Sequence, residues 1–147
     1  MYGHLLVPVD GSELSELATQ ASLELARKLG ARVTAFVAES MPPLPGMGTA
    51  MAAYTRDTEA HQVRTEAHAN KVLAQFAVKA AEQGVKFEGK FQRTDAVDDA
   101  IVRAADEFGC DLIVMVTHGR GAFGELLFGS HTKNVLARSK LPLLVLH

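Results

Sequence analysis

Short apolar runs alternate regularly with longer amphipathic segments along the whole chain. Strand-sized apolar runs occupy residues 5–9, 33–37, 112–116 and 143–146, and a more polar run covers 85–91. Segments with the spacing of a helical face lie between these runs. Such an alternation favours a parallel sheet with helices on both faces. The sequence therefore predicts one α/β domain over residues 1–147, with a doubly wound five-stranded parallel sheet in the order 3-2-1-4-5.

Capping residues, glycines and prolines indicate where the helices begin and end and where the longest loop lies. A first helix should end at Gly30, and its N-cap is either Ser12 or Asp10, the latter with Glu13 in a capping box. The stretch from residue 39 to residue 54 contains three prolines and two glycines, so it is predicted as a mobile loop. A long helix, polar at first and amphipathic later, should follow and end at Gly84. Another helix should start near Thr94, and a last one should run through residues 135 and 136.

Composition and charge exclude several classes of protein. Fifteen Lys and Arg against seventeen Asp and Glu give a net charge of -2, which favours neither nucleic acid nor an anionic membrane as partner. The average hides an asymmetry: residues 118–147 carry four cations and one anion, a net of +3, so the remainder carries -5. The single cysteine and the absence of a signal-peptide pattern predict a cytoplasmic protein. No apolar run approaches the length of about 18 residues that a membrane span needs.

The topology directs attention to two turns. In an open parallel sheet, ligands bind beyond the carboxyl ends of the strands where the winding direction reverses. With the first strand central, that point lies between the first and fourth strands. The two turns are residues 10–12, read Asp-Gly-Ser, and residues 117–119, read Thr-His-Gly.

The glycine-bearing segment after the fourth strand matches two phosphate-binding patterns only superficially. Residues 119–124 satisfy G-x-G-x-x-G, but no acid follows Glu125, so a dinucleotide fingerprint is rejected. Residues 124–130 resemble a Walker A loop, but Ser130 and His131 stand where lysine and serine or threonine belong. Glycines before a helix start still suit an anion site built from backbone N–H groups. The alternative is a permissive loop in which Ser130 only caps the helix.

Two separated motifs carry a resemblance to a known family. The first is Leu-Val-Pro-Val-Asp-Gly-Ser at residues 6–12, and the second is Val-Met-Val-Thr-His-Gly-Arg-Gly at residues 114–121. Gly129-Ser130, Asn-Val-Leu at 134–136, Leu-Pro-Leu-Leu-Val at 141–145 and Asp-Leu-Ile-Val-Met at 111–115 agree with the second motif. Together they resemble the universal stress protein family over nearly the whole chain.

The resemblance implies a Rossmann-like fold and a set of nucleotide-binding residues. The ATP-binding branch of this family has the motif Gly-x-x-Gly, nine residues, then Gly and Ser or Thr. Gly119, Gly129 and Ser130 match it, whereas Val116 replaces its first glycine. Asp10 would face the nucleoside and Val37 would offer its backbone to the adenine. The implied nucleotide-binding set is Pro8, Val9, Asp10, Val37, Met115, Val116, His118, Gly119, Arg120, Gly129, Ser130, His131 and Thr132.

Several of these residues could instead have a purely structural role. Asp10 could serve only as a helix cap, Arg120 could be a solvated loop residue rather than a phosphate ligand, and His118 could only brace its loop. His61 and His68, seven residues apart, are read as surface residues without a third metal ligand, so no metal site from protein side chains is predicted. Cys110 is expected to be packed rather than nucleophilic, and no catalytic residue is assigned.

The functional hypothesis follows from the resemblance. It implies a homodimeric, cytoplasmic stress-response regulator that binds ATP, with AMP and ADP as alternatives, and Mg²⁺ through the phosphates. No enzymatic turnover beyond slow ATP hydrolysis is expected.

The resemblance also implies a dimer interface. The last strand, formed by Leu143, Leu144, Val145 and Leu146, is an apolar sheet edge and is implied to pair with the same strand of a second chain. Unidentified protein partners are also implied. The alternatives are an interaction module of the same fold that does not bind nucleotide, and an adenylyl transferase or phosphotransferase.

Overall fold

The computed structural model describes residues 1–117 and 130–147, and it contains a single five-stranded sheet in the described part of the chain. The strands are parallel and lie in the order β3-β2-β1-β4-β5, which confirms the predicted topology. In chain order they are β1 (His4–Pro8), β2 (Arg32–Glu39), β3 (Phe87–Arg93), β4 (Leu112–Val116) and β5 (Leu143–Leu146). The helices are α1 (Glu13–Leu29), α2 (Met51–Glu82), α3 (Val97–Glu107) and α4 (Ser130–Arg138).

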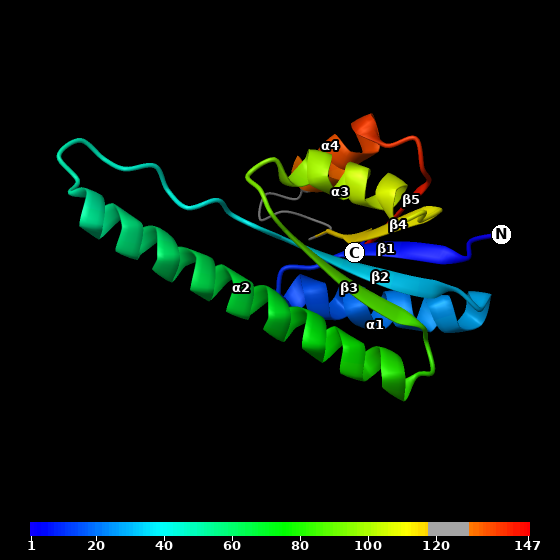
Figure 1. Cartoon of the computed structure of the whole chain (residues 1–147). Coiled ribbons are helices and arrows are strands. Elements are labelled where there is room, and N and C mark those ends of the chain that lie inside the picture. The colour runs from blue at the N-terminus through cyan, green and yellow to red at the C-terminus, as the bar shows by residue number, and fades with distance from the viewer. Residues whose placement is uncertain (118–129) are drawn as a thin grey trace.

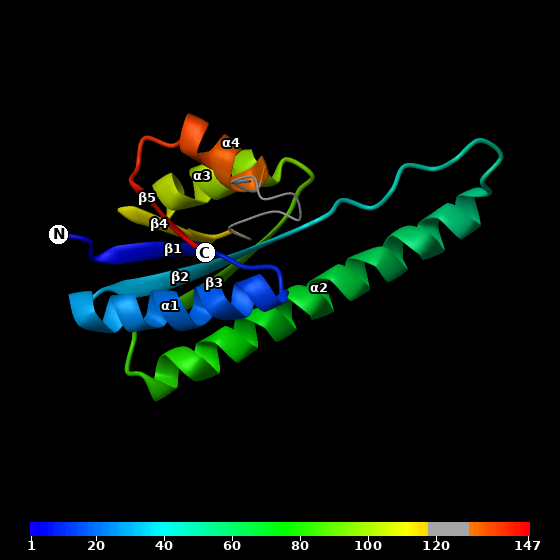
Figure 2. The ribbon, with the colours of Figure 1, turned by 180° about the vertical axis from the view of Figure 1, so that it is seen from behind.

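Helices cover both faces of the sheet. Figures 1 and 2 show α1 and α2 on one face and α3 and α4 on the other. The alternation of side chains along β1 divides the core accordingly: Leu5 and Val7 pack toward α1 and α2, and Leu6 packs toward α3. All three side chains are fully buried. Both faces of the central strand are therefore apolar, as its continuous run of apolar residues predicts.

Helix α2 is much longer than the sheet that it covers. Its buried side chains lie at helical spacing from Thr65 onward and form one stripe: Thr65, Ala69, Val72, Phe76 and Ala80. The first turns, together with the chain from residue 40 to residue 50, extend beyond the sheet (Figures 1 and 2). None of the described helices is both long enough and apolar enough to cross a membrane.

Two predicted boundaries differ from the structure. The predicted loop over residues 39–54 is shorter at both ends, because β2 includes Glu39 and α2 already begins at Met51. No glycine or proline follows Gly48 in this stretch, and Met and Ala at 50–53 favour helix. The N-cap of α3 is Ala96 rather than Thr94, whose Oγ1 accepts a hydrogen bond from the Ala96 N–H at 3.0 Å in the preceding turn.

Candidate functional site

A cleft of about 380 Å³ opens at the carboxyl ends of β1 and β4, where the winding of the sheet reverses. Its volume is within the range of about 300–1,000 Å³ that is usual for small-molecule sites. The first residues of α1 and α4 and one face of α3 complete its walls. The lining residues are Pro8, Val9, Asp10, Ser12, Leu14, Ser15, Ala18, Phe36, Ala38, Val97, Ile101, Met115, Val116, Thr117, His131 and Thr132.

The apolar part of the cleft follows from the alternation of side chains along the strands. Phe36 and Ala38 of β2 and Met115 of β4 point to the sheet face that carries α3. Ile101 and Val97 of α3 come from the opposite side. These side chains form an apolar slot, and its apolar lining suits a weakly polar ring.

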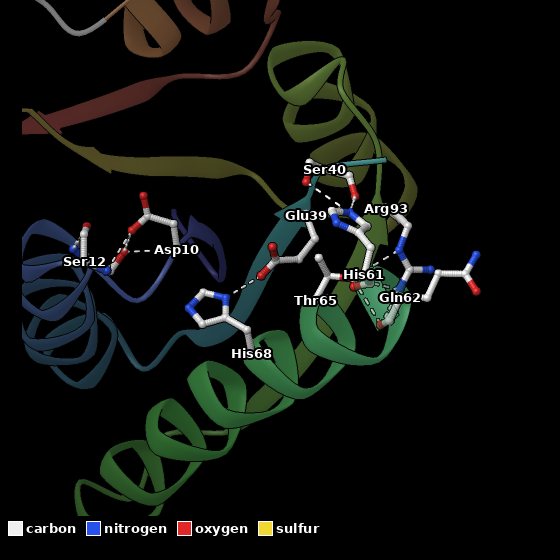
Figure 3. A network of polar contacts seen from close by, with 10 residues as sticks. Asp10, Ser12, Glu39, Ser40, His61, Gln62, Thr65, His68 and Arg93 are labelled. Atoms are coloured by element: carbon white, nitrogen blue, oxygen red, sulfur yellow. Dashed lines mark hydrogen bonds and ion pairs between the residues drawn. The ribbon is translucent and has the colours of Figure 1, made fainter. Parts of the chain in front are cut away.

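Asp10 lies at the rim of this slot, in the turn between β1 and α1 (Figure 3). Its Oδ1 accepts hydrogen bonds from the Ser12 N–H at 2.9 Å and the Ser15 hydroxyl at 2.6 Å. The same hydroxyl accepts a bond from the Asp10 N–H at 2.7 Å. Ser12 is the N-cap of α1, because its Oγ accepts from the Ser15 N–H. Asp10 therefore positions the turn without being the cap itself.

These contacts keep Asp10 ionised. Burial alone would raise the pKa of the Asp10 carboxyl, but the hydrogen bonds from Ser12 and Ser15 outweigh this effect and lower that pKa below its usual value. Both bonds from other residues reach Oδ1, and Oδ2 has no partner among the described residues. An acceptor-only oxygen is thus available at the rim of the cleft to a ligand that carries hydroxyl groups.

The first turn of α4 forms the opposite wall. Thr132 is almost fully buried, and His131 is exposed but held by Asp98 of α3, with 2.6 Å between Nδ1 and Oδ1. The other oxygen of Asp98 accepts a bond from Asn134 Nδ2 at 2.8 Å. Asp98 therefore fixes the start of α4 against α3. The N–H groups of a helix's first turn have no partner within the helix, so they favour an anion nearby.

A second polar network fastens α2 to the end of β2, beside the cleft (Figure 3). His68 Nδ1 lies 2.5 Å from Glu39 Oε1, and His61 Nε2 lies 3.0 Å from the Ser40 carbonyl oxygen. Arg93 of β3 donates to Thr65 Oγ1 of α2 at 3.2 Å. His61 and His68 thus reach the same strand end, and both make structural contacts that the sequence did not predict.

Most of the described residues in the predicted site line the cleft. They are Pro8, Val9, Asp10, Met115, Val116, His131 and Thr132. Val37 is not among the lining residues, and its fully buried side chain packs in the core beneath α1 and α2. The contact of its backbone with an adenine stays a prediction. The predictions for His118, Gly119, Arg120 and Gly129 lie outside the described residues, and Ser130 begins α4.

Neither the apolar slot nor the role of Ser15 was predicted from the sequence. A signal was available for the slot, because Phe36 and Ala38 alternate with Val37 and must point to the other face of the sheet. Ile101 likewise belongs to the apolar stripe of α3. No comparable signal pointed to Ser15, which resembles any other serine in the first turn of a helix.

Cys110 is a packed core residue, and the acidic and histidine side chains form no metal-binding cluster in the described part of the chain. Cys110 is buried, as predicted, and burial raises the pKa of its thiol to about 11, so the thiol stays protonated near neutral pH. Among residues 1–117 and 130–147, no three His, Cys, Asp or Glu side chains form a group that could hold a metal ion.

Comparisons with known proteins agree on one family. Residues 1–147 match the Universal stress protein family. A universal stress protein of Thermus aquaticus is 32% identical over 147 residues, which cover 99% of this chain and 98% of the relative. The crystal structure of a universal stress protein in complex with cAMP superposes with a TM-score of 0.69 at 25% identity, covering 99% of this chain and 97% of that chain.

A further structure supports the fold alone. The universal stress protein UspA of Lactobacillus plantarum superposes with a TM-score of 0.80 at 21% identity, with 99% of this chain and 98% of that chain covered. The family match spans every element from β1 to β5. The chain therefore belongs to the universal stress protein family.

Proposed function

We propose that this protein binds one adenine nucleotide per chain in the cleft between β1 and β4 and acts as a homodimeric, cytoplasmic stress-response regulator. The observation that carries the proposal is the combination, in one cleft, of an apolar slot with an ionised Asp10 and the first turn of a nine-residue helix. A relative with the same fold, at 25% identity, is described in complex with cAMP.

The parts of the cleft match the parts of a nucleotide. The base would lie in the slot between Phe36, Met115 and Ile101, where removal of its faces from water is favourable. The ribose hydroxyls would donate to Oδ2 of Asp10, because a carboxylate accepts strong hydrogen bonds from hydroxyl groups. The phosphate would lie at the first turn of α4, away from the negative charge of Asp10. The phosphates, rather than protein side chains, would carry any Mg²⁺.

The proposed dimer uses the edge of the sheet. Strand β5 pairs only with β4 in the described structure, and all four of its apolar side chains are half-buried. An apolar edge strand of this kind exposes unpaired N–H and C=O groups. Antiparallel pairing of β5 with the same strand of a second copy would satisfy these groups under two-fold symmetry. At tens of micromolar protein, sedimentation should then give the mass of a dimer, and a monomer would contradict this part.

A second candidate function is a module of the same fold that binds protein partners without nucleotide. Val116 favours it, because its β-branched side chain lines the cleft at the position where the ATP-binding motif has glycine. Nucleotide affinity of the Val116→Gly variant separates the two candidates. A large gain over the wild type supports the module, and an unchanged affinity supports nucleotide binding by the natural chain.

Isothermal titration calorimetry with ATP and Mg²⁺, AMP and cAMP tests the leading proposal. At least one nucleotide should bind at one per chain. Asp10→Asn should lower the affinity for that nucleotide about tenfold or more, because a hydrogen bond to a charged group contributes about 1.5–3 kcal/mol. Asp106→Asn is the matched control, because Asp106 is exposed near the C-terminal end of α3. Absence of both heat and a thermal shift with all three nucleotides would contradict the proposal.

A further inference from the structure

A groove runs between α1 and α2 on the sheet face opposite α3 and α4. Two hollows of about 580 Å³ and 480 Å³ share Glu16, Lys79 and Glu82, so they form one continuous depression. Buried Phe76 and Leu23 contribute to its floor. We call this depression the α1–α2 groove.

The groove has an apolar component that the fold leaves exposed. Leu17 of α1 is 55% exposed and Val78 of α2 is 58% exposed, and both line the groove. Neither contributes to the described core. These two side chains would add apolar contact area to any occupant of the groove.

The charges around the groove are mainly negative. Glu13, Glu16 and Glu82 line it together with one cation, Lys79, which leaves two carboxylates uncompensated among the groove's own residues. Lys79 Nζ lies 3.0 Å from Glu16 Oε1 and bridges the two helices. An occupant of this groove should therefore present apolar side chains flanked by positive charge.

The exposed face of α4 has this chemistry. Lys133, Leu136 and Ala137 are all exposed and lie at positions i, i+3 and i+4, so they share one helix face. Leu136 is 60% exposed. Exposed Lys140 follows just beyond the end of the helix. Asp98 and Asp99 of α3 pair with His131 and Arg138, whereas Lys133 and Lys140 have no ion pair within the described residues.

We propose that α4 of one copy docks into the α1–α2 groove of a second copy. Leu136 would contact Leu17 and Val78, and Lys133 and Lys140 would lie near Glu13 and Glu82. Complementary charge at such a contact speeds association and fixes its orientation, while the apolar contact contributes affinity.

The position of the two surfaces determines the form of the assembly. Helices α1 and α2, which form the groove, lie on one side of the sheet, and α4 lies on the other (Figures 1 and 2). One chain therefore cannot join its own two surfaces. Each copy can accept one neighbour and dock onto another, which is a head-to-tail contact that forms a ring or an open chain. This contact does not use β5. The groove shares Ser12 and Ser15 with the nucleotide cleft, but the charged and apolar residues proposed to meet in the contact do not line that cleft, so the contact does not depend on the proposed function.

Sedimentation velocity of the full-length protein, over a range of concentrations at 50 and 300 mM salt, tests the contact. The wild type should form species larger than a dimer at low salt. High salt should dissociate these species, because it screens exposed charges. Glu13→Lys with Glu82→Lys, and separately Lys133→Glu with Lys140→Glu, should each weaken this association about tenfold. An equimolar mixture of the two double variants should regain it, because each surface again meets its opposite charge.

Matched controls carry the same change of charge elsewhere. Glu59→Lys with Glu66→Lys, and Arg56→Glu with Arg64→Glu, alter exposed residues in the N-terminal half of α2, outside the groove, and should associate like the wild type. Thermal unfolding verifies that every variant is folded. The proposal is overturned if no species larger than a dimer forms at low salt. It is equally overturned if the mixed variants fail to associate, or if the controls lose association as much as the groove variants do.

Discussion

Gly11 illustrates how a single residue fixes the geometry beside the cleft. Its φ of +85° lies in the left-handed region, and a Cβ there would lie 2.9 Å from both His68 Nε2 and Val72 Cγ2. His68 is held by Glu39, and Val72 is buried, so neither side chain can easily move away. The turn that carries Asp10 therefore packs against α2 through a position that only glycine fits.

Gly11→Ala should lower the free energy of unfolding by about 3 kcal/mol, because the substitution adds a left-handed alanine and overpacks the contact with α2. Gly30→Ala is the matched control. Gly30 has a φ of +65°, but a Cβ there would meet nothing within 4 Å. It should cost only about 1 kcal/mol. Urea unfolding of both variants measures the difference, and equal losses would contradict the close packing at Gly11.

His4 is a buried titratable residue at the amino end of β1. Its Nε2 lies 2.7 Å from Thr34 Oγ1, and Nδ1 is buried with no hydrogen-bond partner in the described structure. Burial is the main reason that the pKa of His4 lies below its ordinary value of 6.5, and the charge of Arg32 adds to the effect. The folded protein therefore holds His4 neutral more strongly than the unfolded chain does.

This lowered pKa has a consequence for stability. As the pH falls below about 6.5, the unfolded chain binds a proton at His4 before the folded protein does, so the free energy of unfolding decreases. His4→Gln should reduce this decrease between pH 7 and pH 5, whereas His147→Gln, at an exposed terminal position, should leave it unchanged. Urea unfolding at several pH values provides the measurement. A pH dependence identical in wild type and His4→Gln would contradict the burial argument.

At the level of elements, the contact between α3 and α4 shapes one wall of the cleft. Asp98 is 15% exposed and binds both His131 and Asn134, whereas Asp99 and its partner Arg138 are each about half exposed. Both acids lie in the first turn of α3, so they interact equally with its helix dipole. Asp98→Ala and Asp99→Ala are therefore matched variants. They differ mainly in the partners that each carboxylate loses: His131 and Asn134 for Asp98, and Arg138 for Asp99.

Asp98→Ala should destabilise the protein by about 1 kcal/mol more than Asp99→Ala, because it removes two hydrogen bonds, one of them partly buried, rather than one exposed ion pair. Asp98→Ala should also weaken binding of the proposed nucleotide, because the first turn of α4 loses the contacts that hold it against α3. Thermal unfolding and calorimetry of the two variants measure both effects. If the two variants are equally stable and bind equally well, Asp98 does not position α4.

The sequence predicted elements well where one periodicity dominates and poorly where two signals compete. The apolar runs located β1, β2, β4 and β5, because a buried parallel strand is apolar on both faces. The start of α2 was misplaced, since the prolines and glycines of residues 42–48 obscured the helix formers that follow. The choice between Ser12 and Asp10 as N-cap depends on backbone geometry, which the sequence alone does not reveal.

At the scale of the whole molecule, the doubly wound topology determines where chemistry can occur. The predicted strand order located the cleft at the carboxyl ends of β1 and β4, and seven of the predicted residues line it. The apolar slot could not be assembled in the same way, because it combines side chains from β2, β4 and α3 that only the folded chain brings together. The α1–α2 groove also arises only from packing of elements distant in sequence.

The proposed function requires that the cleft bind one adenine nucleotide per chain. Its most direct test is calorimetric titration of the wild-type protein with ATP and Mg²⁺, AMP and cAMP, alongside Asp10→Asn and the Asp106→Asn control. We predict saturable binding of at least one of these nucleotides at one per chain, weakened about tenfold or more by Asp10→Asn and unchanged by Asp106→Asn. No binding of any of the three, or equal binding by wild type and Asp10→Asn, would contradict the proposed site.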